Sequence, residues 1–182
     1  MTSTSRAFAA AAASAALLFA LAACSSDAPE AAPSASGTQT VQVGDEACAD
    51  DAGITVAVDA SALQDGDSKA WCIDTDETLA AADALTLVNV STEGTDEYGD
   101  QVVCRVNGVP AEDLAIPAAD GSDYFETCES MPAANAYWSL WVKPAGGEWG
   151  YAEEGLSTLE LEPGQSLELL FQLNGEPAQP TT

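Results

Sequence analysis

Five cysteines are the side chains best able to do chemistry in this sequence. Four of them form an even set, which in an exported protein is typical of disulfides: Cys48, Cys72, Cys104 and Cys128. Four cysteines allow three pairings. We favour Cys48 with Cys72 and Cys104 with Cys128, because each pair closes a loop of about 25 residues, worth roughly 3 kcal/mol in chain entropy. A four-cysteine zinc site is the alternative, but the close CxxC spacing of such sites is absent.

The N-terminal segment, residues 1–23, has the layout of a secretory signal. It carries one cation, Arg6, and then an apolar run that ends in small residues. Residues 21–24, LAAC, resemble the bacterial lipobox, in which the cysteine is lipidated and the chain is cleaved in front of it. The resemblance implies a lipid anchor on Cys24 and a place on the extracytoplasmic face of the cell membrane. A transmembrane anchor is the alternative, but this Ala-rich run is borderline for a bilayer, which needs about 20 apolar residues.

Composition divides the rest of the chain into three parts. Residues 24–40 are rich in Ala, Ser and Pro without a hydrophobic period, so they are expected to form a disordered linker. Residues 41–173 are long enough for one domain with an ordinary hydrophobic core. Residues 174–182 are short and polar, and we expect a disordered tail.

Charge and composition exclude several classes of function. The net charge is −26 with only four Lys and Arg, so the surface repels phosphates and nucleic acid is not a partner. The chain has no His, which removes the commonest metal ligand and the commonest general base. Carboxylate pairs are so abundant that none of them indicates a site, and no EF-hand spacing is present. We therefore expect no enzyme, no metal site and no cofactor.

The first half of the domain is predicted to hold strands and one helix. Residues 53–59, GITVAVD, are predicted to form the first strand, and residues 69–73 a second. An acidic start followed by apolar residues at helical spacing predicts a helix of about ten residues from Asp74 or Thr75 onward. Residues 85–90 and 101–106 are predicted to form a hairpin.

The second half begins with an irregular, acidic connection, residues 110–132. Four segments of strand character follow, 137–143, 148–152, 159–161 and 167–173, and they predict two hairpins in series. The fold class is therefore α+β: a small antiparallel sheet domain with one helix and two disulfides, behind a lipidated flexible tether.

Aromatic residues concentrate in the first of these hairpins. Strand alternation places Tyr137 and Trp141 on one face and Trp138 on the other. One face has to be core, so most of these rings are expected to pack there. The remainder are our candidates for stacking against a flat ligand: Trp141, Trp149 and Tyr151, with Tyr137 beside them.

Several segments resemble a family of bacterial surface proteins related to the C-terminal domain of transcobalamin and intrinsic factor. They are GITVAVD at 53–59, VVCRVNG at 102–108, CESMP at 128–132 and AYWSLWVKPAGGEWGYAEEG at 136–155, with PG at 163–164. The resemblance implies a small antiparallel domain with one helix that captures a ligand, cobalamin or another corrinoid.

Two non-enzymatic functions are expected from these observations. The first is a lipid-anchored accessory protein that binds a vitamin or other small molecule for an uptake system, with a transporter as partner. The second is a cell-surface interaction or adhesion module without a small-molecule ligand. A concave pocket beside the aromatic rings would distinguish the first from the second.

Overall fold

The computed structural model describes residues 41–49, 51–118 and 120–181. The expected signal segment 1–23, the expected lipidation site Cys24 and the expected linker 24–40 lie outside the described residues. Within the described part the chain is mostly sheet, with a single helix and two disulfides, Cys48–Cys72 and Cys104–Cys128. The predicted α+β class and the favoured cysteine pairing are confirmed.

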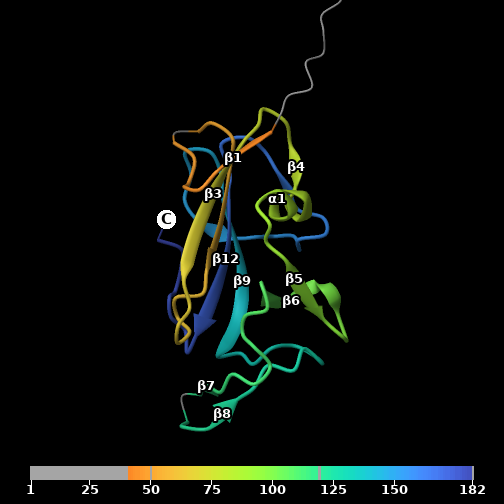
Figure 1. The fold of residues 1–182 in the computed structure, drawn as a ribbon, viewed down its shortest axis with the longest axis vertical. Helices are drawn as coiled ribbons and strands as arrows, with labels where there is room; N and C mark the ends of the chain where they lie inside the picture. The colour runs from red at the N-terminus through yellow and green to blue at the C-terminus, as the bar shows by residue number, and fades with distance from the viewer. Residues whose placement is uncertain (1–40, 50, 119, 182) are drawn as a thin grey trace, which may run out of the picture. The chain divides into compact units, whose positions relative to one another are not determined.

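A six-stranded sheet forms the centre of the fold (Figure 1). Every pairing in it is antiparallel except that of β12 with β2. In spatial order the strands are β1 (Gln42–Gly44), β3 (Ser68–Asp74), β2 (Ile54–Asp59), β12 (Ser166–Leu173), β9 (Ala136–Lys143) and β10 (Gly150–Tyr151).

The helix and three two-stranded sheets complete the fold (Figure 1). The helix α1 spans Ala81–Leu87. The paired strands are β4 (Leu79–Ala80) with β11 (Glu160–Leu161), β5 (Thr92–Thr95) with β6 (Gly99–Val106), and β7 (Ile116–Pro117) with β8 (Asp123–Tyr124).

One face of the large sheet, the core face, carries the main hydrophobic core. Alternate residues of its strands, among them Ile54, Leu169 and Phe171, are buried there together with Ala84 and Leu85 of α1. Figure 1 shows α1, β4 and the β5–β6 hairpin on that side of the sheet. Burial of this apolar surface is the main source of folding free energy.

The opposite face, the second face, is more polar but also largely covered. Thr55, Ser139, Glu168 and Gln172 are all buried on it, beside Trp141. These residues alternate along their strands with the core residues, so the two faces differ in chemistry although both exclude water.

The C-terminal segment helps to cover the second face. We expected residues 174–182 to be a disordered tail, but as far as Thr181 the chain folds back after β12. Leu173 and Glu176 exchange backbone hydrogen bonds, the Nε2 of Gln172 donates to the oxygen of Pro177 at 3.2 Å, and Pro180 is buried. Hydrogen bonds to the buried sheet offset the entropy that a polar tail loses on ordering.

Two predictions in the first half of the domain are wrong. A strand, β1, precedes residues 53–59, because Gln42–Gly44 pairs with the outer side of β3. The helix begins at Ala81 rather than at Asp74 or Thr75: Asp74 still belongs to β3, and Leu79–Ala80 pairs with β11. Sheet pairing of these residues overrides the local signal of an N-cap.

Of the three predicted hairpins, one is confirmed, one is found with a different first strand, and one is wrong. β5 and β6 do form a hairpin, but its first strand is Thr92–Thr95, because residues 85–87 belong to the helix. The hairpin of β9 and β10 is confirmed. The predicted hairpin of residues 159–161 with 167–173 is wrong, since β11 pairs with β4 and β12 lies between β2 and β9.

The core position of Phe171 provides a test of this arrangement. Its ring is 1 % exposed and packs edge-on against Trp138, with 5.3 Å between the ring centroids. Phe171→Ala is expected to lower the free energy of unfolding by about 3–5 kcal/mol, measured by urea denaturation without reductant. Val43→Ala, at a 42 % exposed position, is the control, with a loss below about 1 kcal/mol. Equal losses in the two variants would contradict the core assignment.

Candidate functional site

The four candidate aromatic residues separate into two groups in the structure. Trp141 is 6 % exposed, so its ring is not open to a ligand. The ring of Tyr151 stacks on the Trp141 ring with 4.0 Å between the ring centroids. The indole Nε1 of Trp141 donates a hydrogen bond to the Oγ of Ser139 at 2.9 Å. Ser139 in turn donates to the backbone oxygen of Leu170 at 2.8 Å. Trp141 is therefore a packing residue of the second face.

Tyr137 and Tyr151 belong to the same group. Burial raises the pKa of Tyr137, and a hydrogen bond with Tyr151 raises it further. The hydroxyl of Tyr151 also accepts a hydrogen bond from Gln172 at 3.4 Å, although the side chain as a whole is 58 % exposed. These contacts tie the exposed ring to the sheet and leave its outer side open.

Trp149 lies with Lys143 rather than with the other three candidates. The Nζ of Lys143 lies 5.6 Å from the centroid of the Trp149 ring, within the range of a cation–π contact. Lys143 ends β9, and Trp149 immediately precedes β10, so residues 144–147 turn the chain back between them. The hydrogen bond from Gly147 N–H to the oxygen of Pro144 closes this turn at 2.9 Å.

Strand register brings polar side chains beside this pair. Ser166 of β12 is opposite both Lys143 of β9 and Thr55 of β2, and Thr55 is opposite Cys72 of β3. Residues that are directly opposite in a sheet point to the same face. One row of side chains therefore crosses four strands at the end of the second face where β2 and β12 begin.

A cavity of about 220 Å³ opens at this end of the sheet. A second cavity of about 360 Å³ adjoins it, and both are lined by Lys143 and Trp149. We call the two together the Trp149 cleft. The first part is further lined by Asp51, Thr55, Gln165 and Ser166, and the second by Glu148 and the C-terminal residues Gln179, Pro180 and Thr181.

Two glycines shape the wall of the first part. Gly53 has a φ of +73°, and a Cβ at this position would lie 2.4 Å from the oxygen of Ile73. Gly164 has a φ of +89° and donates its N–H to the oxygen of Gly53 at 2.6 Å. Both positive φ angles favour glycine, and at Gly53 the backbone oxygen of Ile73 is so close that there is no room for a side chain. The loops before β2 and β12 are thus joined at the cleft.

The disulfide Cys48–Cys72 secures the same wall. Cys48 lines the cavity, and its backbone N–H donates to the Oγ1 of Thr55 at 2.9 Å. Its partner Cys72 is on β3, opposite Thr55. The loop that carries Asp51 is therefore attached covalently to the sheet and by a hydrogen bond to the floor of the cavity.

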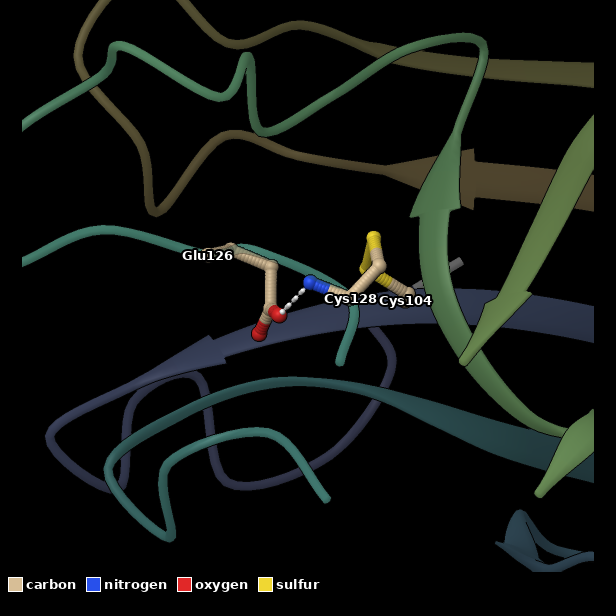
Figure 2. A group of neighbouring side chains, drawn as sticks. All are labelled: Cys104, Glu126 and Cys128. Atoms are coloured by element: carbon tan, nitrogen blue, oxygen red, sulfur yellow. Dashed lines mark hydrogen bonds between the residues drawn. A yellow bond between two sulfur atoms is a disulfide. The ribbon is translucent and has the colours of Figure 1, made fainter. Parts of the chain in front are cut away.

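The second disulfide lies beside a buried carboxylate (Figure 2). Cys104, Glu126 and Cys128 bring potential metal-ligand atoms within 4.8 Å of one another. The Oε1 of Glu126 accepts the N–H of Cys128 at 2.7 Å, and its Oε2 accepts the hydroxyl of Tyr124 at 2.5 Å. Because the sulfurs are bonded to each other and the carboxylate already accepts two hydrogen bonds, we assign this cluster a structural role.

Arg105 completes this structural cluster. Its guanidinium is largely buried, and it donates to the backbone oxygens of Pro110 at 2.8 Å and of Glu126 at 2.6 Å. Its Nη1 lies 3.1 Å from the carboxylate of Glu93 and 2.7 Å from the Sγ of Cys128. A cation in this position opposes the binding of a metal ion and holds the irregular connection 110–132 against β5 and β6.

Larger cavities exist, but their lining residues offer fewer kinds of functional group. One of about 620 Å³ lies between α1 and β5, and among its lining residues Asp100 alone is charged. Another of about 550 Å³ has an acidic rim that includes Glu148, Glu153 and Glu154. The first part of the Trp149 cleft is smaller, but it brings together an indole ring, an ammonium, a carboxylate, two hydroxyls and an amide.

Sequence reasoning identified Trp149 and missed the rest of the cleft. Lys143 could have been suspected, because it follows the aromatic strand in a chain with few cations. Asp51, Thr55, Gln165 and Ser166 gave no such signal. Ser166 meets Lys143 through the antiparallel pairing of β12 with β9, and Thr55 joins them through the parallel pairing of β2 with β12. The sequence indicated neither pairing.

Comparison of the chain with protein-family models, with curated proteins and with solved structures found no match. Within the part of the chain that the structure describes, no helix is both long and apolar enough to cross a lipid bilayer.

The hydrogen bond between half-buried Tyr124 and buried Glu126 predicts a tyrosine with a raised pKa. Burial, followed by the hydrogen bond to Glu126, raises the pKa of Tyr124 from 10.0 to about 12. Since the folded-state value is the higher one, this pair stabilises the fold fully below pH 10, and the contribution is lost as the pH rises toward about 12. In a phenolate absorbance titration, Tyr124→Phe is expected to remove the component near pH 12.

Tyr98→Phe is the control for this titration, because Tyr98 is exposed and its pKa is raised mainly by the charge of Glu97. This variant should retain the component near pH 12. An unchanged late component in Tyr124→Phe would show that Tyr124 is not the tyrosine that titrates near pH 12.

Proposed function

We propose that this chain is a lipoprotein anchored on the extracytoplasmic face of the membrane, where it binds a small molecule in the Trp149 cleft without catalysing a reaction. The observation that carries the proposal is the cleft itself: a half-buried indole ring beside an ammonium, with polar groups from the loop before β2, from the start of β12 and from the C-terminal segment. Concave sites with an apolar wall and a few convergent polar groups are typical of small-molecule binding.

The extracytoplasmic location is supported by two independent features. Residues 21–24 resemble a lipobox, and the two disulfides are of a kind that persists in oxidising compartments outside the cytoplasm. On this proposal, residues 24–40 are the tether and residues 41–173 are the domain that it carries.

A binding role agrees better with the cleft than an enzymatic one. The chain contains no His. Both parts of the cleft carry a carboxylate, but among the residues that the structure describes, no nucleophile in the cleft is hydrogen-bonded to a general base. A binding protein of this kind delivers its ligand to a transporter or to another surface protein, which is the partner we propose.

The first part of the cleft also bears on the ligand's size. Its volume of about 220 Å³ lies below the roughly 300–1,000 Å³ of sites for drug-sized ligands, so it would enclose a small ligand or one group of a larger one. The resemblance of several segments to the transcobalamin-like family adds a corrinoid to the candidate ligands. A corrinoid is therefore one test ligand among several.

Loss of the proposed anchor is expected to release the protein from the membrane. In Cys24→Ser the thiol that would receive the lipid is absent, so the protein should move from the membrane fraction to the soluble fraction on cell fractionation. Cys48→Ser with Cys72→Ser, which leaves Cys24 in place, should remain in the membrane fraction. A Cys24→Ser protein that stays with the membrane would contradict lipidation at this residue.

Binding is tested by tryptophan fluorescence of the full chain in detergent micelles. A corrinoid, an amino acid mixture, neutral disaccharides and citrate are titrated separately. At least one is expected to give a saturable change that is lost in Trp149→Ala and retained in Tyr151→Ala.

The opposite pattern, loss in Tyr151→Ala and retention in Trp149→Ala, would place the ligand on the Trp141–Tyr151 pair instead. A flat response to every solute would contradict small-molecule binding and favour the interaction or adhesion module. Thermal unfolding of each variant shows whether a lost response reflects a lost fold.

A further inference from the structure

The Trp149 cleft carries charges of both signs in a strongly acidic molecule. Lys143 and Asp51 line its first part, and Glu148 lines its second part. The whole chain has a net charge of −26. These charges restrict which ligands can enter.

Ligands of either net charge are disfavoured for separate reasons. An anion approaching the cleft meets the repulsive field of the acidic surface. A cation is attracted by that field, but at the Trp149 ring it would have to lie close to the Lys143 ammonium, whose Nζ is 5.6 Å from the ring centroid. A neutral ligand avoids both costs, so the cleft selects by hydrogen bonds and apolar contact.

The hydrogen-bonding groups of the cleft include both donors and acceptors. The Lys143 ammonium only donates and the Asp51 carboxylate only accepts, whereas the hydroxyl of Ser166 does both. Gln165 accepts the N–H of Glu162 through its Oε1 at 2.9 Å, which orients its amide NH₂ group as a donor. A ligand with several adjacent hydroxyls, each both donor and acceptor, matches this mixture.

The indole ring supplies the apolar contact that such a ligand needs. Trp149 is half-buried and lines both parts of the cleft. One face of a sugar ring presents C–H groups, which pack against an aromatic face while the hydroxyls point outward around the ring. The cavity of about 220 Å³ beside Trp149 is of a size for one such unit.

We propose that the Trp149 cleft binds a neutral saccharide, with one sugar ring against Trp149 and its hydroxyl groups hydrogen-bonded to Lys143, Asp51, Gln165 and Ser166. This inference rests on the proposed binding function and narrows it to one class of ligand.

The chain offers a matched control for Lys143. Lys69 also lies over a tryptophan, with its Nζ 4.9 Å from the ring centroid of Trp71. It belongs to β3, it forms an exposed ion pair with Asp45, and it does not line the cleft. Substitution of Lys69 therefore removes the same kind of cation without touching the proposed site.

The test is calorimetric titration of the full chain in detergent micelles with maltose, cellobiose and di-N-acetylchitobiose, and with citrate and spermidine as charged probes. At least one neutral saccharide is expected to bind, with an affinity independent of salt concentration, because no net charge is neutralised. Lys143→Met should weaken this binding about tenfold through loss of a charged hydrogen bond, whereas Lys69→Met leaves it unchanged.

Variants of Trp149 report on the stacking contact. Trp149→Ala should weaken saccharide binding by about tenfold or more, and Trp149→Phe, which keeps an aromatic face, should restore most of it. If none of the three saccharides binds, the inference is overturned. Binding of citrate or spermidine that is lost in Trp149→Ala would overturn the ligand class and leave the proposed binding function intact. If neither these probes nor any of the solutes titrated above binds, both the saccharide inference and the proposed binding function are overturned.

Discussion

The strand β12 forms backbone hydrogen bonds with β2 on one side and β9 on the other, and the rest of the structure depends on this central position. Its residues from Leu167 to Gln172 are all buried, because neighbours lie on both edges and packed groups lie on both faces. Parallel pairing with β2 also brings the beginnings of two strands distant in the sequence to the same end of the sheet. The cleft lies where those two strands begin.

Covalent and ionic contacts fix the irregular parts around this sheet. One disulfide attaches the loop before β2 to β3, at the wall of the cleft. The other, together with buried Arg105 and Glu126, holds the connection between β6 and β9. A loop without regular hydrogen bonding loses much entropy on ordering, so such cross-links are needed where the hydrophobic core does not reach. The regular sheet and the linked loops thus position the cleft together.

Local sequence patterns predicted the elements whose residues interact with near neighbours in the chain. The strand within residues 53–59 and the hairpin of β9 with β10 are of this kind, and both are found, although the first four residues of β2 are buried on both faces rather than alternately. The helix start and the second C-terminal hairpin were wrong, because Leu79–Ala80 and β11 pair with each other across a long sequence separation. A pattern read along the chain cannot show which distant strand will satisfy a strand's hydrogen bonds. The three consecutive apolar residues Leu169, Leu170 and Phe171 in β12, which place apolar side chains on both faces as in a central strand, were the one available hint.

The sequence by itself determined the α+β class, the pairing of neighbouring cysteines that we favoured, the acidic character of the surface and the presence of an aromatic cluster. Only the tertiary structure decided which aromatic ring is packing and which lines a cavity. Trp141 is covered by Tyr151, whereas Trp149 stands beside Lys143 at the end of the sheet. Residue type sets what a side chain can do, but exposure and neighbours are set by strand order and register, which arise from contacts between distant parts of the chain.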